Sequence, residues 1–276
     1  MPEQQKDSTI RIAALADLHY TSQGKASLMP ILMAAAEAAD IVLICGDLTD
    51  HGLAEEAADL GRDLSSFRVP ILAVLGNHDF HSDQQDEIKR VLSDSPIRVL
   101  DGESVEFHGV GFAGVKGFAS GFGRGVLEPW GEQIIKQFVR EAVDEALKLE
   151  SALARLRTET RIALLHYAPI VGTVEGEPPE IHAFLGCSRL EEPLNRFQVT
   201  AAFHGHAHQG QSEGRTSTGI PVYNVSLPLL RRTAPDGPPF RLIEVVAAPP
   251  PEQADQASSP APSGSGSSTE PSRRRT

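Results

Sequence analysis

The sequence predicts an α/β protein, and two observations lead to this fold class. Five short runs of apolar, often β-branched residues are bounded by Gly, Asp or Asn, as buried strands are. Segments with apolar residues at helical spacing follow several of these runs, and this alternation of strand and helix is typical of α/β folds. The predicted strands span residues 10–16, 41–45, 69–75, 161–165 and 199–203.

Four segments are predicted to be helices, at residues 28–39, 53–67, 83–92 and 131–157. The last is the longest, and we expect its apolar stripe to pack on the core. Part of the stripe is also a candidate face for a homodimer. The stripe consists of Ile134, Ile135, Phe138, Val139, Val143, Ala146, Leu147, Leu153 and Leu156.

Residues 97–119 show a different pattern, in which Val and Phe are separated by Gly and polar residues. This pattern predicts two or three short strands that form a meander.

The predicted elements place one folded domain at residues 10–247. With 40% hydrophobic residues, such a domain can bury one large core. Residues 1–9 are polar and are expected to be flexible. Residues 248–276 are rich in Pro, Ser and Gly and cannot bury enough apolar surface to fold, so they are expected to be a disordered tail.

The composition argues against several classes of protein. The net charge of -12 does not suit a groove for a nucleic-acid duplex or an anionic membrane surface, because both need a basic stripe. Two cysteines provide no readable disulfide framework and fit a reducing compartment. We find neither a secretory signal nor the ~18 apolar residues of a membrane span, and therefore expect a cytoplasmic protein.

Five polar motifs follow the five predicted strands in order, so we expect them to gather at one edge of a sheet. Imidazole, carboxylate and amide oxygen together suit Mn, Fe or Zn, and the absence of thiolates argues against a structural zinc site. One carboxylate can bridge two cations, and two-metal hydrolases hold their ions about 3.5–4 Å apart. Each motif alone is also an ordinary strand-end turn, but the ordered set favours a dinuclear metal site. The motifs are Asp17-Leu18-His19, Gly46-Asp47-Leu48-Thr49-Asp50, Gly76-Asn77-His78-Asp79, His166 and Gly205-His206-Ala207-His208.

Three further histidines, His51, His81 and His204, lie beside these motifs. They could line the pocket, although solvated loop or strand-end positions are the simpler interpretation.

The ordered motifs resemble those of the calcineurin-like metallophosphoesterase superfamily: Asp-x-His, Gly-Asp-x-x-Asp, Gly-Asn-His-Asp/Glu, a lone His and Gly-His-x-His. The resemblance extends from Ile10 to about Val246. It implies two stacked mixed β-sheets flanked by helices, an α/β/β/α sandwich in which residues 97–119 turn from the first sheet into the second. It also implies two metal ions, as Mn2+, Fe2+ or Fe3+, or Zn2+. By the same resemblance Asp17, His19 and His208 bind one ion, Asn77, His166 and His206 bind the other, and Asp47 bridges them.

Departures from particular subfamilies narrow the function that the resemblance implies. Protein Ser/Thr phosphatases continue the second motif with a phosphate-clamping Arg, whereas this chain has His51. Purple acid phosphatases place Tyr where Asp50 stands, and the diacylglucosamine pyrophosphatases tend to carry Arg where His78 stands. The chain looks most similar to bacterial phosphodiesterases, including the class III cyclic nucleotide enzymes, which act on small phosphoesters.

Three alternatives remain beside a phosphodiesterase. A phosphomonoesterase of the same superfamily would use the same metal site. A non-catalytic scaffold would usually lack several ligand positions, and all are filled here. A DNA repair nuclease would be expected to bring a capping domain and a basic surface, and the sequence shows neither.

The predicted mechanism uses two residues that are not ligands in the resemblance. Metal binding lowers the pKa of water from about 15.7 to near 7, so a hydroxide held between two ions can attack phosphorus in line. His78 is predicted to protonate the leaving oxygen or stabilise its charge. Asp50 is predicted to hold and polarise His78.

Overall fold

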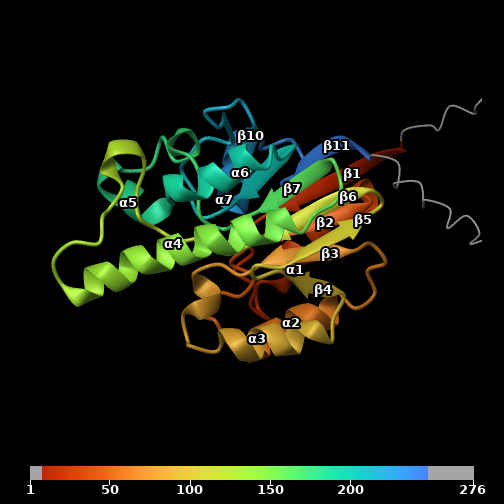
Figure 1. Cartoon of the computed structure of the whole chain (residues 1–276). Coiled ribbons are helices and arrows are strands. Elements are labelled where there is room, and N and C mark those ends of the chain that lie inside the picture. Colours follow the sequence, from red (N-terminus) through yellow and green to blue (C-terminus); the bar gives the residue numbers. More distant parts are fainter. Residues whose placement is uncertain (1–7, 248–276) are drawn as a thin grey trace, which may run out of the picture.

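The computed structural model describes residues 8–247, which form two stacked β-sheets with helices on both outer faces (Figure 1). This arrangement confirms the predicted α/β/β/α sandwich. The first strand begins at Ser8, two residues earlier than predicted. The predicted flexible N-terminus covered residues 1–9, of which residues 8–9 belong to β1. Residues 1–7 and the predicted disordered tail, residues 248–276, lie outside the described residues.

The first sheet has five strands in the order β11-β1-β2-β3-β4. The strands from β1 to β4 run parallel to their neighbours, and β11 pairs antiparallel with β1 at one edge. The bounds are β1 (Ser8–Leu15), β2 (Ile41–Cys45), β3 (Ile71–Val74), β4 (Ile97–Val99) and β11 (Arg241–Ala247).

The second sheet has six strands in the order β5-β6-β7-β8-β10-β9. Its central strands β6, β7, β8 and β10 are parallel, and β5 and β9 pair antiparallel at the edges. The bounds are β5 (Ser104–Phe107), β6 (Val110–Gly114), β7 (Thr160–Leu164), β8 (Ala201–His204), β9 (Glu213–Arg215) and β10 (Pro221–Asn224).

Side chains alternate between two cores along the buried strands. In β1, Ile12 and Ala14 point into the core between the sheets, whereas Ala13 and Leu15 point into the core under the helices of the first sheet. Successive strand residues face opposite sides, and both sides are covered here, which explains the continuous apolar runs in the sequence.

Helices α1, α2 and α3 cover the outer face of the first sheet, and α4 and α6 cover that of the second. Their bounds are α1 (Lys25–Ala38), α2 (Ala54–Asp63), α3 (Gln85–Ser93), α4 (Gln133–Ala154) and α6 (Glu191–Arg196). Two shorter helices, α5 (His182–Leu185) and α7 (Leu227–Thr233), lie in connections. The 3₁₀ turns are η1 (His78–Phe80), η2 (Gly123–Gly125), η3 (Val171–Thr173), η4 (Pro179–Ile181) and η5 (Ser188–Leu190).

The predicted stripe on α4 is only partly buried. The buried side of this helix recurs every three or four positions and is formed by Val139, Ala142, Glu145, Leu149, Ala152 and Leu153. Ile134 and Leu147 are 67% and 53% exposed because Ile134 lies in the first turns, which extend past the strands (Figure 1), and Leu147 lies off the buried face. The homodimer face therefore stays a proposal.

Two or three short strands were predicted in residues 97–119, and the structure has three. They do not form one meander, because β4 joins the first sheet, whereas β5 and β6 form an antiparallel pair in the second. The segment is thus the turn from one sheet to the other that the resemblance implied. No helix within residues 8–247 combines the length and apolar character needed to cross a membrane.

Candidate metal centre

The predicted ligands follow the carboxyl ends of strands from both sheets. Asp17, Asp47, His166 and His206 each stand two residues after the last residue of β1, β2, β7 and β8, and Asn77 follows β3 by three. Parallel strands bring their carboxyl ends to the same edge, so loops from the two sheets meet there.

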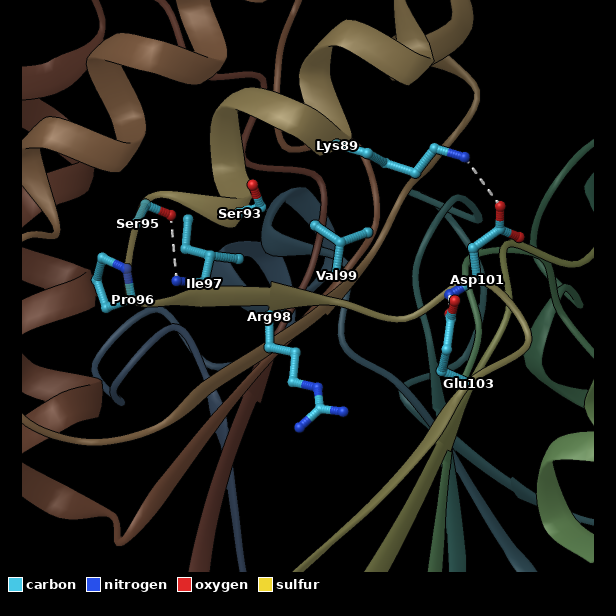
Figure 2. A pocket seen from close by; sticks show the side chains of 9 residues that line it. All are labelled: Lys89, Ser93, Ser95, Pro96, Ile97, Arg98, Val99, Asp101 and Glu103. Atoms are coloured by element: carbon cyan, nitrogen blue, oxygen red, sulfur yellow. Dashed lines mark hydrogen bonds and ion pairs between the residues drawn. The ribbon is translucent and has the colours of Figure 1, made fainter. Parts of the chain in front are cut away.

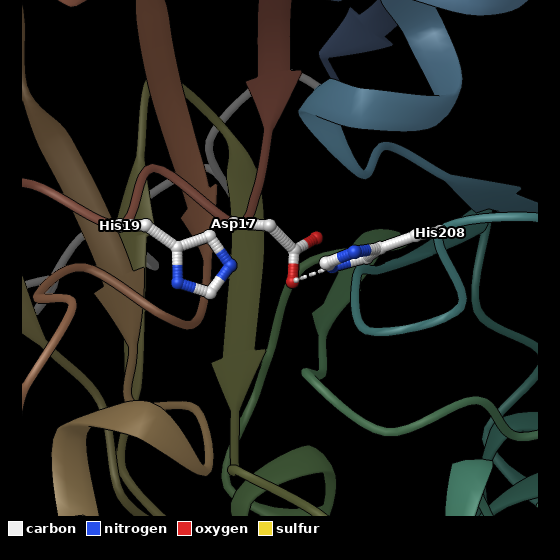
Figure 3. Close-up of side chains that lie close together, drawn as sticks. All are labelled: Asp17, His19 and His208. Carbon is white, nitrogen blue, oxygen red and sulfur yellow. Dashed lines mark ion pairs between the residues drawn. The ribbon is translucent and has the colours of Figure 1, made fainter.

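Asp17, His19 and His208 form the first group of donor atoms, all within 4.8 Å of one another (Figure 3). The Oδ1 atom of Asp17 lies 3.3 Å from Nε2 of His208. Both oxygens of Asp17 also accept from the backbone N–H of His206 at 3.1 Å, which ties the first loop to the last.

Asp47, His166 and His206 form the second group, again within 4.8 Å. Asn77 belongs beside them, because its Oδ1 is 2.9 Å from Nε2 of His166. The two oxygens of Asp47 face different groups: Oδ1 lies 3.4 Å from Nε2 of His166, and Oδ2 lies 3.8 Å from Nε2 of His19.

The hydrogen bonds of His166 fit a cation in this second group. Its Nδ1 lies 3.0 Å from the carbonyl oxygen of Cys45 and must carry the ring hydrogen to donate to it. Burial lowers the pKa of His166, so the ring is neutral and Nε2 holds only a lone pair. That lone pair faces the oxygens of Asn77 and Asp47, and a cation between them would turn three repelling acceptors into ligands.

His206 is oriented in the same way. Its Nε2 lies 3.2 Å from the carbonyl oxygen of Phe184, which leaves Nδ1 for the metal centre. A carbonyl that accepts from the ring N–H on the nitrogen away from the metal is a usual partner of a metal-binding histidine. The orienting carbonyls of Cys45 and Phe184 were not predicted, because a main-chain oxygen carries no residue type that a sequence could reveal.

The two buried carboxylates influence one another. Burial, followed by the negative charge of Asp17, raises the pKa of Asp47 to about 7. Burial also opposes the ionisation of Asp17, but the hydrogen bond from His208 and nearby imidazoles outweigh it and lower the pKa of Asp17 to about 2. Without cations, the site therefore holds one ionised carboxylate readily and the second with difficulty.

Four of the predicted ligands have left-handed backbone conformations. The φ angles are 58° at Asp17, 43° at His19, 50° at Asp47 and 70° at His206. Such values are uncommon for residues other than glycine and persist where surrounding contacts impose them, often at functional sites. The loops thus hold the donor atoms in position at a cost in backbone energy.

The glycines of the motifs are required by close packing against the ligands. A Cβ atom on Gly76 would lie 2.1 Å from Oδ1 of Asp47. A Cβ atom on Gly46, where φ is 89°, would lie 2.3 Å from Nδ1 of His166. Any other residue at either position would displace a ligand.

Asp79, the last residue of the third motif, has a structural role that the sequence analysis did not predict. Its fully buried carboxylate accepts from the backbone N–H groups of Gly76, Leu48 and Thr49 at 2.8, 3.2 and 2.9 Å. The hydroxyl of Thr49 donates to it at 2.6 Å. Asp79 therefore fastens the loop of Asn77 to the loop of Asp47.

The geometry around His78 differs from the prediction for Asp50. Nδ1 of His78 lies 2.7 Å from the main-chain oxygen of Asp50 but 3.8 Å from its carboxylate. The carboxylate is nearer to His19, with Oδ1 at 3.3 Å from Nδ1. The backbone of Asp50 thus orients His78. Its carboxylate lies beside the candidate ligand His19, but the contact does not have the geometry of a hydrogen bond.

The three neighbouring histidines occupy different surroundings. His51 is exposed and its Nδ1 pairs with Glu56 at 2.7 Å. His81 packs edge-on against His78 with ring centres 5.5 Å apart. His204 is fully buried rather than solvated, with Nε2 at 2.8 Å from the hydroxyl of Thr173, because β8 carries it into the second sheet.

Two cavities of about 480 Å³ differ in their relation to the metal centre. One lies along β4 near the ion pair of Lys89 and Asp101 and includes none of the candidate ligands (Figure 2). The other adjoins the metal centre through Asp50 and His51. Its acidic lining residues are Asp50, Glu55, Glu56 and Asp59.

A fold of two stacked sheets with these donor groups at one edge is the architecture of a metallophosphoesterase. Residues 10–210 match the calcineurin-like phosphoesterase family, and the chain belongs to this family. The match supports a phosphoester hydrolase and confirms the predicted superfamily. Among curated protein sequences, none matches the chain.

Solved structures share the fold at low sequence identity. The phosphopantetheinyl hydrolase of Mycobacterium tuberculosis is similar with a TM-score of 0.59 and 13% identity, over 91% of this chain and 98% of that one. TT1561 of Thermus thermophilus has a TM-score of 0.52 and 14% identity, over 87% and 100%. GAP50, described as the anchor in the inner membrane complex of Plasmodium, has a TM-score of 0.53 and 12% identity, over 81% and 73%. At these identities the likeness concerns the fold alone.

Proposed function

We propose that this protein hydrolyses a phosphodiester with two metal ions held by Asp17, His19, Asp47, Asn77, His166, His206 and His208. The observation that carries the proposal is the position of Asp47, whose two oxygens face the two donor groups at 3.4 and 3.8 Å. The nitrogen and oxygen donors suit Mn2+, Fe2+ or Fe3+, or Zn2+. Ions bound there would lower the pKa of the attacking water and neutralise charge on the phosphate.

His78 is the proposed proton donor to the leaving oxygen. The Nδ1–H of its protonated ring donates to the main-chain oxygen of Asp50. The Nε2–H is then left to donate to the leaving oxygen. The backbone N–H of His78 donates to Oδ1 of Asp47 at 2.8 Å, which holds the main chain of His78 against the proposed bridging carboxylate.

Two features favour a diester over a monoester. His51, which stands where the protein phosphatases have a clamping Arg, is engaged by Glu56 and offers no free cation to a phosphate dianion. The cavity beside it is lined by acidic side chains, which repel additional negative charge. A diester carries one negative charge fewer and needs less neutralisation, and a diester with an alkoxide leaving group would also gain from His78 as a proton donor.

The complete donor set separates this proposal from a scaffold. GAP50 is described as an anchor and has a similar fold, so the fold by itself does not establish catalysis. In this chain each predicted ligand lies with its partners at one edge of the sheets.

Metal dependence tests the proposal. The chelated protein should not hydrolyse bis(4-nitrophenyl) phosphate, and Mn2+, Zn2+ or Fe2+ added separately should restore turnover with about two ions per chain. Full activity after complete removal of metal would contradict the proposal.

A matched pair of substrates tests the preference. At pH 8, kcat/KM for bis(4-nitrophenyl) phosphate should exceed that for 4-nitrophenyl phosphate, and the 2′,3′- and 3′,5′-cyclic nucleotides should be assayed beside them. A clear preference for the monoester would replace the phosphodiesterase by a phosphomonoesterase with the same metal site.

A further inference from the structure

Tyr167 directly follows the candidate ligand His166 and packs against the second donor group. Its ring centre is 4.6 Å from that of His206 and 5.5 Å from that of His166. Phe118 packs against it at 5.8 Å, and Nζ of Lys116 lies 5.5 Å from its centre. The residue is only 7% exposed, so these neighbours hold the ring in one position.

The backbone joins Tyr167 to the ligand beside it. The carbonyl oxygen of Lys116 accepts from the N–H of His166 at 2.9 Å and from the N–H of Tyr167 at 3.1 Å. One oxygen thus fixes both residues after β7, and the position of the tyrosine follows the position of the ligand.

The hydroxyl of Tyr167 has no hydrogen-bond partner within residues 8–247, although nine-tenths of the residue is buried. Among the described residues, the oxygen is not one of the fully buried polar atoms that lack a partner, so it keeps some exposure to solvent. Buried tyrosine hydroxyls normally find a partner, as that of Tyr20 does in Asp63 at 2.5 Å. The ring that carries this unpaired hydroxyl packs against two candidate metal ligands, so the hydroxyl is available to a molecule that binds at the second donor group.

We propose that Tyr167 is a substrate-contacting residue whose hydroxyl donates a hydrogen bond to a non-bridging oxygen of the substrate phosphate. The inference rests on the proposed function, because it places a phosphate at the metal centre. A phenol is protonated at neutral pH and provides a donor without a positive charge. Such a donor suits the single charge of a diester and complements the absence of an Arg at position 51.

The test compares Tyr167→Phe with Tyr223→Phe in the metal-loaded full-length protein. Each change removes one hydroxyl and keeps the ring, and Tyr223 packs on Phe203 and Arg241 rather than on candidate ligands. The probe is inorganic phosphate, with its affinity measured by calorimetry. Metal content, melting temperature and kcat/KM for bis(4-nitrophenyl) phosphate are measured on the same samples.

Tyr167→Phe should keep both metals and the melting temperature while weakening phosphate binding about 10- to 100-fold, as expected for a hydrogen bond to a charged group. Its kcat/KM should fall by a similar factor, and Tyr223→Phe should match the wild type in every measurement. Phosphate affinity unchanged in Tyr167→Phe, loss of metal in that variant, or no phosphate binding by the wild type would each overturn the inference. If the wild type binds phosphate through Tyr167 but hydrolyses no ester, the inference holds and the proposed function fails.

Discussion

The imidazole of His166 shows how a main-chain oxygen selects the atom that is left for a metal. Its one ring hydrogen goes to the carbonyl of Cys45, so Nε2 must face Asn77 and Asp47 as a lone pair. The side chains Asn77 and His166 could be predicted because their residue types are metal ligands in an ordered motif. The orienting carbonyl could not, because every residue has one.

Asp47→Ala and His78→Ala should both lower kcat but should differ in metal content. Asp47→Ala removes the carboxylate that faces both donor groups, so metal content and kcat should fall together. His78→Ala should keep both metals and lower kcat by ~10²–10⁴-fold, because it removes only the proton donor. Metal analysis and steady-state kinetics check both variants. Loss of metals in His78→Ala would show that the role proposed for His78 is wrong.

Asp50→Asn separates the main-chain role of Asp50 from its side-chain role. The substitution leaves the carbonyl that holds His78, but it removes the charge 3.3 Å from Nδ1 of His19. We therefore expect weaker metal binding by about 10-fold or more, with kcat nearly restored at saturating metal. A kcat defect that excess metal does not relieve would show that the carboxylate acts on His78 after all.

Among the elements, the loops after the strands are more constrained than the helices. Gly76 and Asp79 hold the third loop against the second, because a hydrogen in place of a side chain lets Asp47 approach and a buried carboxylate binds both backbones. Helix α4 shows the opposite case. Its apolar sequence pattern overestimated burial at Ile134 and Leu147, since periodicity does not reveal where a helix extends past its sheet.

Gly76→Ala should disrupt the metal centre without touching a ligand. The new Cβ would lie 2.1 Å from Oδ1 of Asp47, so the loop or the carboxylate must move, and metal affinity should fall at least ~10-fold with a lower melting temperature. Gly125→Ala is the matched control, because nothing lies within 4 Å of a Cβ at that position. Metal titration and thermal unfolding are measured on both variants. If Gly76→Ala and Gly125→Ala do not differ, this account of the third motif is wrong.

At the scale of the molecule, the metal centre requires that two sheets meet at one edge. The parallel strands of each sheet could be predicted from their buried apolar runs and the loops that follow them. The strands β9, β10 and β11 were not predicted. Strands β9 and β10 have only three and four residues, too few to show a period, and no polar motif follows the apolar residues of β11. The pairing of β11 with β1 is set by tertiary packing.

The strand β11 makes the end of the domain testable by truncation. Stopping the chain after Ala248 keeps every described strand, so melting temperature and turnover should be nearly unchanged. Stopping it after Gly237 removes β11, which pairs with β1 along seven residues, and also removes the buried Phe240. Strand β1 would become an unprotected edge and lose part of its core, so we expect aggregation or no folded protein. Circular dichroism and thermal unfolding distinguish the two truncated chains. A stable, active chain ending at Gly237 would show that the sheet does not depend on β11, and a large loss on stopping after Ala248 would assign a structural role to the C-terminal residues.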